Sequence, residues 1–142
     1  MNEQELTRFL TAQERDYAVA LAEIKQGRKR SHWMWYIFPQ IAGLGFSATS
    51  RLYAIKDKSE AVAYLQHPVL GSRLVEITRV LLELDENHAG RIFGNPDDMK
   101  LKSSMTLFGA LPGADPVFSR VLAKYFNGIQ DWVTLRLLSE AG

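Results

Sequence analysis

The hydrophobic residues of this chain recur mainly at intervals of three and four positions. The clearest series runs through Leu70, Leu74, Ile77, Leu81 and Leu84, which step by four, three, four and three. Residues with this spacing share one face of an α-helix, which has about 3.6 residues per turn. The series therefore predicts an amphipathic helix that turns one face toward the core.

Residues typical of helix ends divide the rest of the chain into short segments. Asp115-Pro116 and Asp131 are typical helix starts, and Gly27 and Gly128 are typical stops. Together with the hydrophobic spacing, they predict seven or eight short helices joined by tight connections. We expect an all-α fold and a single compact domain over residues 1–142. The expected helices begin near Leu6, Ser31, Ser47 or Ser50, Ser59, Pro68, Asn95, Asp115 and Asp131, with one further helical turn around Ile92.

The densest hydrophobic segment is aromatic and shows no clear period. It runs from Ser31 to Gln40 and contains two tryptophans, a tyrosine and a phenylalanine. This composition favours a buried strand, but a strand needs a partner, and no other segment alternates cleanly over five or more residues. We therefore expect a short buried helix that Ser31 caps and that ends before Pro39. The glycine-rich loop after it, from Ile41 to Phe46, is expected to form a pocket wall.

Composition excludes several classes of protein and of site. The 142 residues, 46% of them hydrophobic, suffice for one core but not for two domains. The formal charge of +1 gives no global field that would draw the protein to a nucleic acid polymer or a membrane. Without cysteine there are no disulfides and no thiolate metal sites. An acidic N-terminus and the lack of an apolar run of about 18 residues argue against export and membrane insertion, so we expect a cytoplasmic protein.

Two groups of polar residues are candidates for binding an anion. Lys29 and Arg30 follow the expected end of the first helix, where cations either complement the helix dipole or bind an anionic ligand. Lys100, Ser103 and Ser104 form a polar strip beside the hydrophobic face of their helix. The strip is either exposed to solvent, with its serines bonded to the preceding turn, or a phosphate or carboxylate site.

Candidates for proton transfer are fewer. His32 lies between the basic cluster and the tryptophans, where it is either a core residue or a catalytic one. Asp98 is the candidate general base if the Lys100 strip lines a cavity; otherwise it and Asp97 compensate the helix dipole. The three histidines lack the spacing of a helical zinc site, and no phosphate-binding loop or dinucleotide fingerprint is present, so we expect no metal and no cofactor.

The polar and aromatic candidates would suit a nucleotide-like ligand if they converge in space. Aromatic rings stack on planar bases or cations, whereas lysine and arginine bind phosphate. The set of candidate ligand-binding residues is Lys29, Arg30, Ser31, Trp33, Trp35, Tyr36, Gln40, Ser47, Ser50, Tyr53, Lys100, Ser103 and Ser104.

Four segments carry long and specific motifs. They are Lys29-Arg30-Ser31-His32-Trp33-Met34-Trp35-Tyr36-Ile37-Phe38-Pro39-Gln40, Ser50 with Tyr53-Ala54-Ile55, His67-Pro68-Val69-Leu70-Gly71 with Arg73-Leu74, and Asp98-Met99-Lys100-Leu101 leading to Ser103-Ser104-Met105-Thr106-Leu107-Phe108. In these motifs the chain closely resembles a bacterial family of small helical proteins, catalogued as domain of unknown function 1810 and sometimes mislabelled as calpastatin-like. The resemblance spans nearly the whole chain. It implies an all-α fold and no established activity.

A fainter likeness concerns the layout of the C-terminal helices around Met105 and Lys124-Tyr125-Phe126. There the chain is similar to a family of NAD- and ADP-ribose-associated helical proteins that look like N-glycosidases. The likeness leads to our first hypothesis, a cytoplasmic protein that binds a phosphorylated ribosyl or nucleotide-like ligand related to NAD or ADP-ribose. In its stronger form the protein hydrolyses the N-glycosidic bond of that ligand, with His32 or Asp98 moving the proton. The alternative is a non-enzymatic helical module whose aromatic segment is core or a protein interface.

Overall fold

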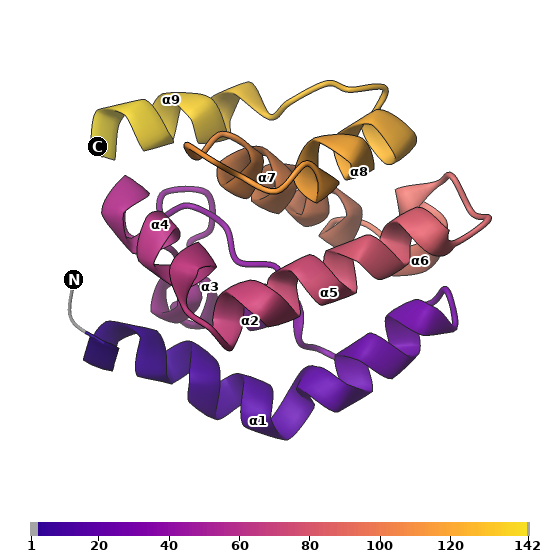
Figure 1. Cartoon of the computed structure of the whole chain (residues 1–142), viewed down its shortest axis with the longest axis horizontal. Helices are drawn as coiled ribbons and strands as arrows, with labels where there is room; N and C mark the ends of the chain where they lie inside the picture. Colours follow the sequence, from indigo (N-terminus) through magenta and orange to yellow (C-terminus); the bar gives the residue numbers. More distant parts are fainter. Residues whose placement is uncertain (1–2, 142) are drawn as a thin grey trace.

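Nine helices follow one another along residues 3–141, the part of the chain that the computed structural model describes. The all-α prediction is confirmed, with one helix more than expected, because the turn around Ile92 is a helix of its own. Figure 1 shows the helices in chain order. They are α1 (Glu3–Lys25), α2 (Met34–Ile37), α3 (Ala48–Tyr53), α4 (Lys58–Gln66), α5 (Leu70–Glu83), α6 (Ala89–Phe93), α7 (Asp97–Gly109), α8 (Val117–Phe126) and α9 (Trp132–Ala141).

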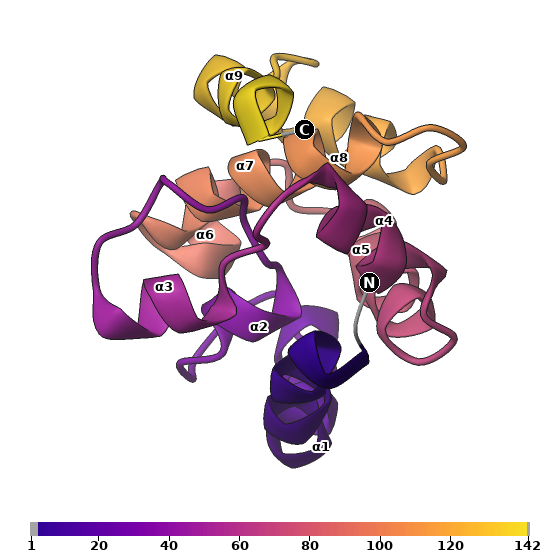
Figure 2. The same ribbon diagram turned by 90° about the vertical axis from the view of Figure 1, so that its left-hand side faces the viewer.

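The helices form one domain with α1 and α9 on opposite sides. Both views place α1 at the bottom, α9 at the top, and the other helices between them (Figures 1 and 2). The central helix is α5, which packs against α1, α4 and α8, while α7 packs against α6, α8 and α9. As the sequence predicted, Leu70, Leu74, Ile77 and Leu81 of α5 are buried.

The contact of α4 with α5 requires a glycine. A Cβ atom added at Gly71 would lie 1.9 Å from the carbonyl oxygen of Leu65 at the end of α4. No side-chain movement relieves such an overlap, because the atom in the way belongs to the backbone. Gly71 therefore fixes how closely the two helices approach.

Several predicted helix ends are present, and one start is displaced. Ser47 caps α3 by accepting a hydrogen bond from the Ser50 amide, and Asp131 caps α9 by accepting one from the Thr134 amide. At α4 the prediction of Ser59 as the start is wrong, because Asp57 caps the helix two residues earlier and accepts from the Glu60 amide at 2.9 Å.

The end of α1 was also predicted correctly. The helix stops after Lys25, and Gly27 adopts a positive φ of 80°. The amide of Gly27 bonds to the Ile24 carbonyl at 2.9 Å, and the amide of Arg28 bonds to the Glu23 carbonyl at 3.1 Å. These two bonds are those of a Schellman motif, which satisfies carbonyls that the helix leaves free.

The aromatic segment is helical, but its predicted cap is wrong. Helix α2 begins at Met34 without any side-chain cap, because the hydroxyl of Ser31 bonds to Glu23 on α1 instead. Trp33, Phe38 and their neighbours pack into the core. A single parallel bridge, Ile41 to Ile55, is the only β-type pairing within the described residues, and it joins the loop after α2 to the chain after α3.

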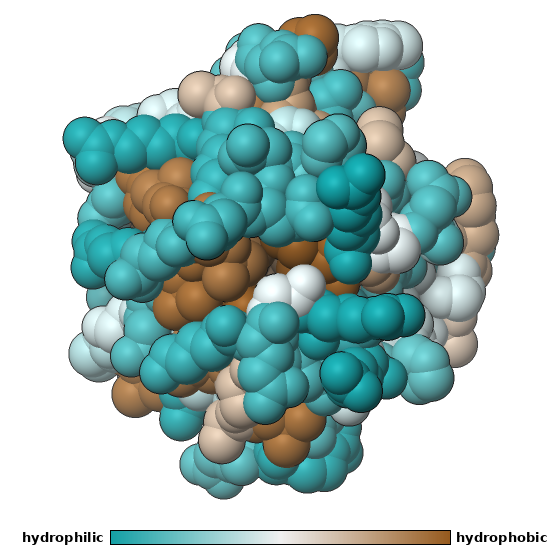
Figure 3. Space-filling view, turned by 90° about the vertical axis from the view of Figure 1, so that its right-hand side faces the viewer, coloured by the Kyte–Doolittle hydropathy of each residue, from teal (hydrophilic) through white to brown (hydrophobic). Residues whose placement is uncertain are grey.

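Some hydrophobic side chains reach the surface of the molecule. Figure 3 shows one face of the molecule, on which hydrophobic residues appear in a hollow framed by hydrophilic ones. Among the described residues, the exposed large hydrophobic side chains include Phe46 at 78%, Trp132 at 67% and Met99 at 48%. Within residues 3–141, no helix is both long enough and apolar enough to cross a membrane.

Candidate functional site

One hollow draws its walls from four separate parts of the chain. An inner part with a cavity volume of about 20 Å³ and an outer part with one of about 260 Å³ share Gln40, Leu44, Gly45 and Ser50. We call the two parts together the Gln40 pocket. The inner part is completed by Trp35, Ile41, Tyr53 and Ala54, and the outer part by Pro96, Met99, Lys100, Ser103, Asp131 and Val133.

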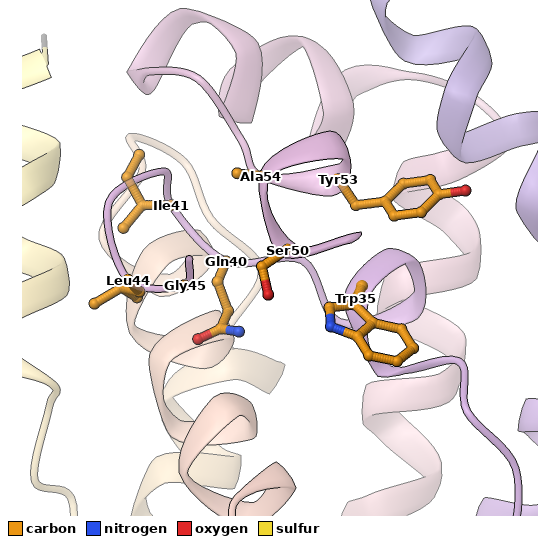
Figure 4. Close-up of a pocket in the computed structure, with 8 residues that line it drawn as sticks. All are labelled: Trp35, Gln40, Ile41, Leu44, Gly45, Ser50, Tyr53 and Ala54. Atoms are coloured by element: carbon orange, nitrogen blue, oxygen red, sulfur yellow. The ribbon is translucent and has the colours of Figure 1, made fainter. Parts of the chain in front are cut away.

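The pocket joins segments that are far apart in the sequence. Trp35 comes from α2, Gln40 from the loop after it, and Ser50 from α3, whereas Lys100 lies on α7 and Asp131 immediately precedes α9. Figure 4 shows the hydroxyl of Ser50 directed into the space between Gln40 and Trp35. The aromatic segment and the Lys100 strip, singled out separately in the sequence, thus meet at one site.

Two glycines allow the loop between α2 and α3 to form the pocket wall. A Cβ atom at Gly45 would lie 2.6 Å from the Cβ of Ser50, so the loop can pack against α3 only without a side chain there. Gly43 has a positive φ of 107°, and its Cβ position lies 3.2 Å from Leu137 on α9. The loop is therefore held between α3 and α9.

Lys100 is held at the pocket by an aromatic ring and a carboxylate. Its Nζ lies 5.4 Å from the centroid of the Trp35 ring and 3.4 Å from Oδ1 of Asp97. The other oxygen of Asp97 lies 2.9 Å from Nζ of Lys29, which lies over Trp33 at 5.1 Å. Two lysines thus share one carboxylate, so the group as a whole keeps a net positive charge, and the ammonium of Lys100 borders the pocket.

The pocket also contains hydrogen-bonding groups that are unused within residues 3–141. The side-chain amide of Gln40 has no partner there, so its donors and its acceptor are available to a ligand. The hydroxyl of Ser50 accepts a hydrogen bond from Ser47 at 2.8 Å and keeps its own proton free to donate. These groups can bind either a donor or an acceptor.

The two carboxylate oxygens of Asp131 are not equivalent. Oδ2 accepts hydrogen bonds from Ser103 Oγ at 3.2 Å, from the Thr134 amide at 3.1 Å and from Thr134 Oγ1 at 2.5 Å. Oδ1 accepts none from the described residues. Asp131 lines the pocket, and because its Oδ2 is already used, Oδ1 is the oxygen left to accept a further hydrogen bond.

Several predicted site residues lie in a different place, around Glu23. This carboxylate accepts hydrogen bonds from the amides of Arg30 (2.7 Å) and Ser31 (3.0 Å), from Ser31 Oγ (2.5 Å) and from Trp33 Nε1 (2.9 Å). Burial alone would raise the pKa of Glu23, but these hydrogen bonds outweigh burial and lower it to about 2. Ser31 and Trp33 therefore hold the turn between α1 and α2 and do not line the pocket; the side chain of Arg30 is exposed and does not line it either.

Tyr36 and Ser104 are also outside the pocket. Tyr36 is buried, and its hydroxyl donates to Asp16 on α1. Burial, followed by this hydrogen bond, raises the pKa of the Tyr36 hydroxyl. Ser104 is fully buried, and its hydroxyl has no partner among the described residues. Tyr53 does line the inner part, but its ring points away from Gln40, as Figure 4 shows.

The two predicted proton carriers lie away from the pocket. The side chain of His32 is exposed and is not among the lining residues. Oδ1 of Asp98 accepts from the amide of Met99 at 2.8 Å and from Asn95 Nδ2 at 3.2 Å, and its Oδ2 faces α6 at 3.5 Å from the Cβ position of Gly90. Neither group is placed to act on a ligand in this pocket.

Two carboxylates that matter for the pocket were not predicted as site residues. The sequence identified Asp131 as a helix cap and Asp97 as compensation for a helix dipole. Their contacts with the pocket and with Lys100 depend on tertiary packing, which these local roles do not indicate. Asp131 lines the pocket, and Asp97 holds Lys100. Within residues 3–141, no group of three or more histidines and carboxylates is placed to hold a metal ion.

Comparison with known proteins places the chain in a family. A solved structure, the conserved hypothetical protein Rv1873 from Mycobacterium tuberculosis, is 45% identical, with a TM-score of 0.94 over 97% of this chain and 99% of that one. No curated protein matches the chain. Residues 3–138 match the family model described as "Protein of unknown function (DUF1810)". The chain therefore belongs to the DUF1810 family.

Proposed function

We propose that the Gln40 pocket binds a small anionic, nucleotide-like ligand in the cytoplasm. The observation that carries the proposal is the meeting of Lys100 with Trp35 and Gln40, which brings a cation, an indole ring and a free amide to one hollow. A mostly apolar hollow with a few convergent polar groups is the usual form of a small-molecule site.

The lining assigns different roles to the two ends of such a ligand. The ammonium of Lys100 binds the phosphate, since lysine acts as a compact point charge toward phosphate oxygens. Gln40 and Ser50 donate hydrogen bonds beside it. Leu44, together with Met99, offers an apolar wall to the flat face of a base or a sugar.

The proposal is one of binding, not of hydrolysis. Cleavage of an N-glycosidic bond needs a proton carrier within hydrogen-bond reach of the ligand. His32 and Asp98, which the sequence suggested for this role, do not line the pocket. Whether a bound ligand is cleaved is answered by incubating ADP-ribose with the protein and following adenine release, since adenine is the leaving group of that bond.

The decisive test removes the ammonium and keeps the fold. Lys100→Ala should weaken the binding of AMP and ADP-ribose by about tenfold or more, because it deletes the charged partner of the phosphate. The melting temperature should change little, since Asp97 keeps its ion pair with Lys29. Isothermal titration measures the affinity, and quenching of Trp35 emission, identified with a Trp35→Phe variant, shows where the ligand sits.

A matched control is available on the same helix. Lys102 forms no side-chain ion pair within residues 3–141 and does not line the pocket, so Lys102→Ala should leave the affinity unchanged. Equal losses in the two variants would show that only general charge attraction was measured, and would contradict the proposal. A large stability loss in Lys100→Ala with intact binding would make Lys100 a structural residue.

The interaction module remains the second candidate because two hydrophobic side chains are exposed near the pocket. Phe46 follows the loop residue Gly45, and Met99 lines the outer part of the pocket, yet both are largely exposed. Exposed aromatic side chains are enriched at protein interfaces. If neither melting temperature nor fluorescence responds to millimolar nucleotides, the binding proposal fails and the interface becomes the function to test.

A further inference from the structure

The Gln40 pocket carries a negative group as well as a positive one. Lys100 and Asp131 both line its outer part, on α7 and just before α9. A ligand that offered only anionic oxygens would be attracted by one and repelled by the other. The lining therefore selects a ligand whose two ends differ in chemistry.

The carboxylate limits what the second end can be. An ionised carboxylate only accepts hydrogen bonds, so its free Oδ1 must meet a donor. Oδ2 is already occupied by Ser103 and by two donors of Thr134, which fixes the orientation of the group. A donor presented by the ligand would complete the hydrogen bonding of Asp131 without moving it.

The neighbouring groups favour hydroxyls over an amine. The amide of Gln40 offers both a donor and an acceptor, and Ser50 offers a donor, so the site can bind groups that donate and accept at once. Hydroxyl groups do both, whereas an ammonium only donates. An ammonium group would also lie in the same outer chamber as Lys100, at a cost of like-charge repulsion.

We infer that Asp131 binds the hydroxyl groups of a sugar phosphate whose phosphate is held by Lys100. The ligand class is thus a ribosyl phosphate with free ring hydroxyls, and Asp131 is the residue that distinguishes it from a deoxy sugar. This inference rests on the proposed function and adds a requirement for hydroxyls to it. Acidic side chains bind ribose hydroxyls in the same way in dinucleotide sites.

The test uses a substitution that keeps the helix cap. Asparagine caps helices as well as aspartate does, so in Asp131→Asn the amide oxygen can still accept from Thr134. The amide nitrogen then takes the place of Oδ1 and turns an acceptor into a donor. Asp115 precedes α8 away from the pocket and accepts from the Val117 amide at 2.8 Å, so Asp115→Asn is the matched control.

Isothermal titration of ribose 5-phosphate, 2-deoxyribose 5-phosphate and inorganic phosphate gives the readout. The wild-type protein should bind the ribose compound about tenfold more tightly than the deoxy compound, the effect of one hydrogen bond to a charged group. Asp131→Asn should remove that preference and leave the affinity for inorganic phosphate equal or higher. Asp115→Asn should behave as the wild type.

The outcomes separate this inference from the proposed function. Phosphate binding that depends on Lys100 but shows no preference for ribose over deoxyribose, or a preference that survives Asp131→Asn, would overturn the inference and leave the proposed function standing. Failure of every phosphate and nucleotide to bind would overturn both. The comparison of two sugars on the wild-type protein does not depend on any variant folding.

Discussion

The turn between α1 and α2 depends on the negative charge of Glu23, and Glu23→Gln tests that dependence. Glu23 is only 8% exposed and accepts hydrogen bonds from Arg30, Ser31 and Trp33. Glutamine has the same shape but no charge and one acceptor oxygen instead of two. Since hydrogen bonds to a charged acceptor are about twice as strong as those to a neutral one, the variant should unfold more readily.

The pKa of Glu23 gives the size of the effect. It falls from an ordinary value of 4.5 to about 2 in the folded protein. At about 1.4 kcal/mol per unit of pKa, this difference contributes about 3 kcal/mol to the free energy of unfolding. The unfolded chain takes up the proton near 4.5, so the contribution is complete above that pH and is lost as the pH falls toward 2. At pH 7 a loss of this size lowers the melting temperature of a chain this long by about 10 °C.

Urea unfolding of the wild type and Glu23→Gln at pH 7 and pH 3 measures both effects. The difference in unfolding free energy between the two proteins should shrink at pH 3 to about half of its pH 7 value or less. Glu14→Gln, at an exposed position of α1, is the control and should show no loss at either pH. A loss that is the same at both pH values, or no loss at pH 7, would refute the assignment of the effect to charge.

Two further substitutions test how the pocket and the core are held. Asp97→Ala should lower the free energy of unfolding by about 2–4 kcal/mol in urea titrations, because it leaves the buried ammonium of Lys29 unpaired. Lys100→Ala should lower it by about 1 kcal/mol or less. Equal losses in the two variants would contradict this reasoning. Gly71→Ala should prevent α4 and α5 from packing, since its Cβ would overlap the carbonyl of Leu65. Circular dichroism and gel filtration should then show an expanded chain, and a native melting curve would contradict the reasoning.

Features that depend on local chemistry could be predicted from the sequence. The amphipathic series of α5 predicted its buried face, and the caps at Ser47 and Asp131 were recognised because capping involves residues only three positions apart. Ser31 was a wrong cap because its hydroxyl bonds to Glu23, a residue of the preceding helix. Competition from a residue outside the local segment does not show in a local pattern.

Which of the two tryptophans of the aromatic segment lines the pocket could not be predicted from the sequence. Trp33 is buried and bonds to Glu23, whereas Trp35 lines the pocket, so the two indoles do not share one site. That choice was made by Glu23 on α1, which bonds to one indole, and by Lys100 on α7, which lies over the other.

The sequence predicted the capping role of Asp131 correctly but did not predict that this residue lines the pocket. Its capping role accounts for one oxygen, and nothing in the local sequence shows that the other borders a pocket. That position depends on α9 lying beside α7, which is a matter of tertiary packing. A residue with a satisfactory local explanation can therefore have a second role that only the fold reveals.

The last part of the pocket wall, Asp131, comes from near the C-terminal end of the described chain. During synthesis, Trp35 and Gln40 leave the ribosome long before Asp131, because they lie about 90 residues earlier in the chain. The side of the Gln40 pocket that Asp131 lines is incomplete until α9 packs against α7 and Leu137 packs against the loop at Gly43. Occupancy of the hollow and attachment of the final helix are consequently linked equilibria, so whatever fills the hollow also slows the detachment of that helix.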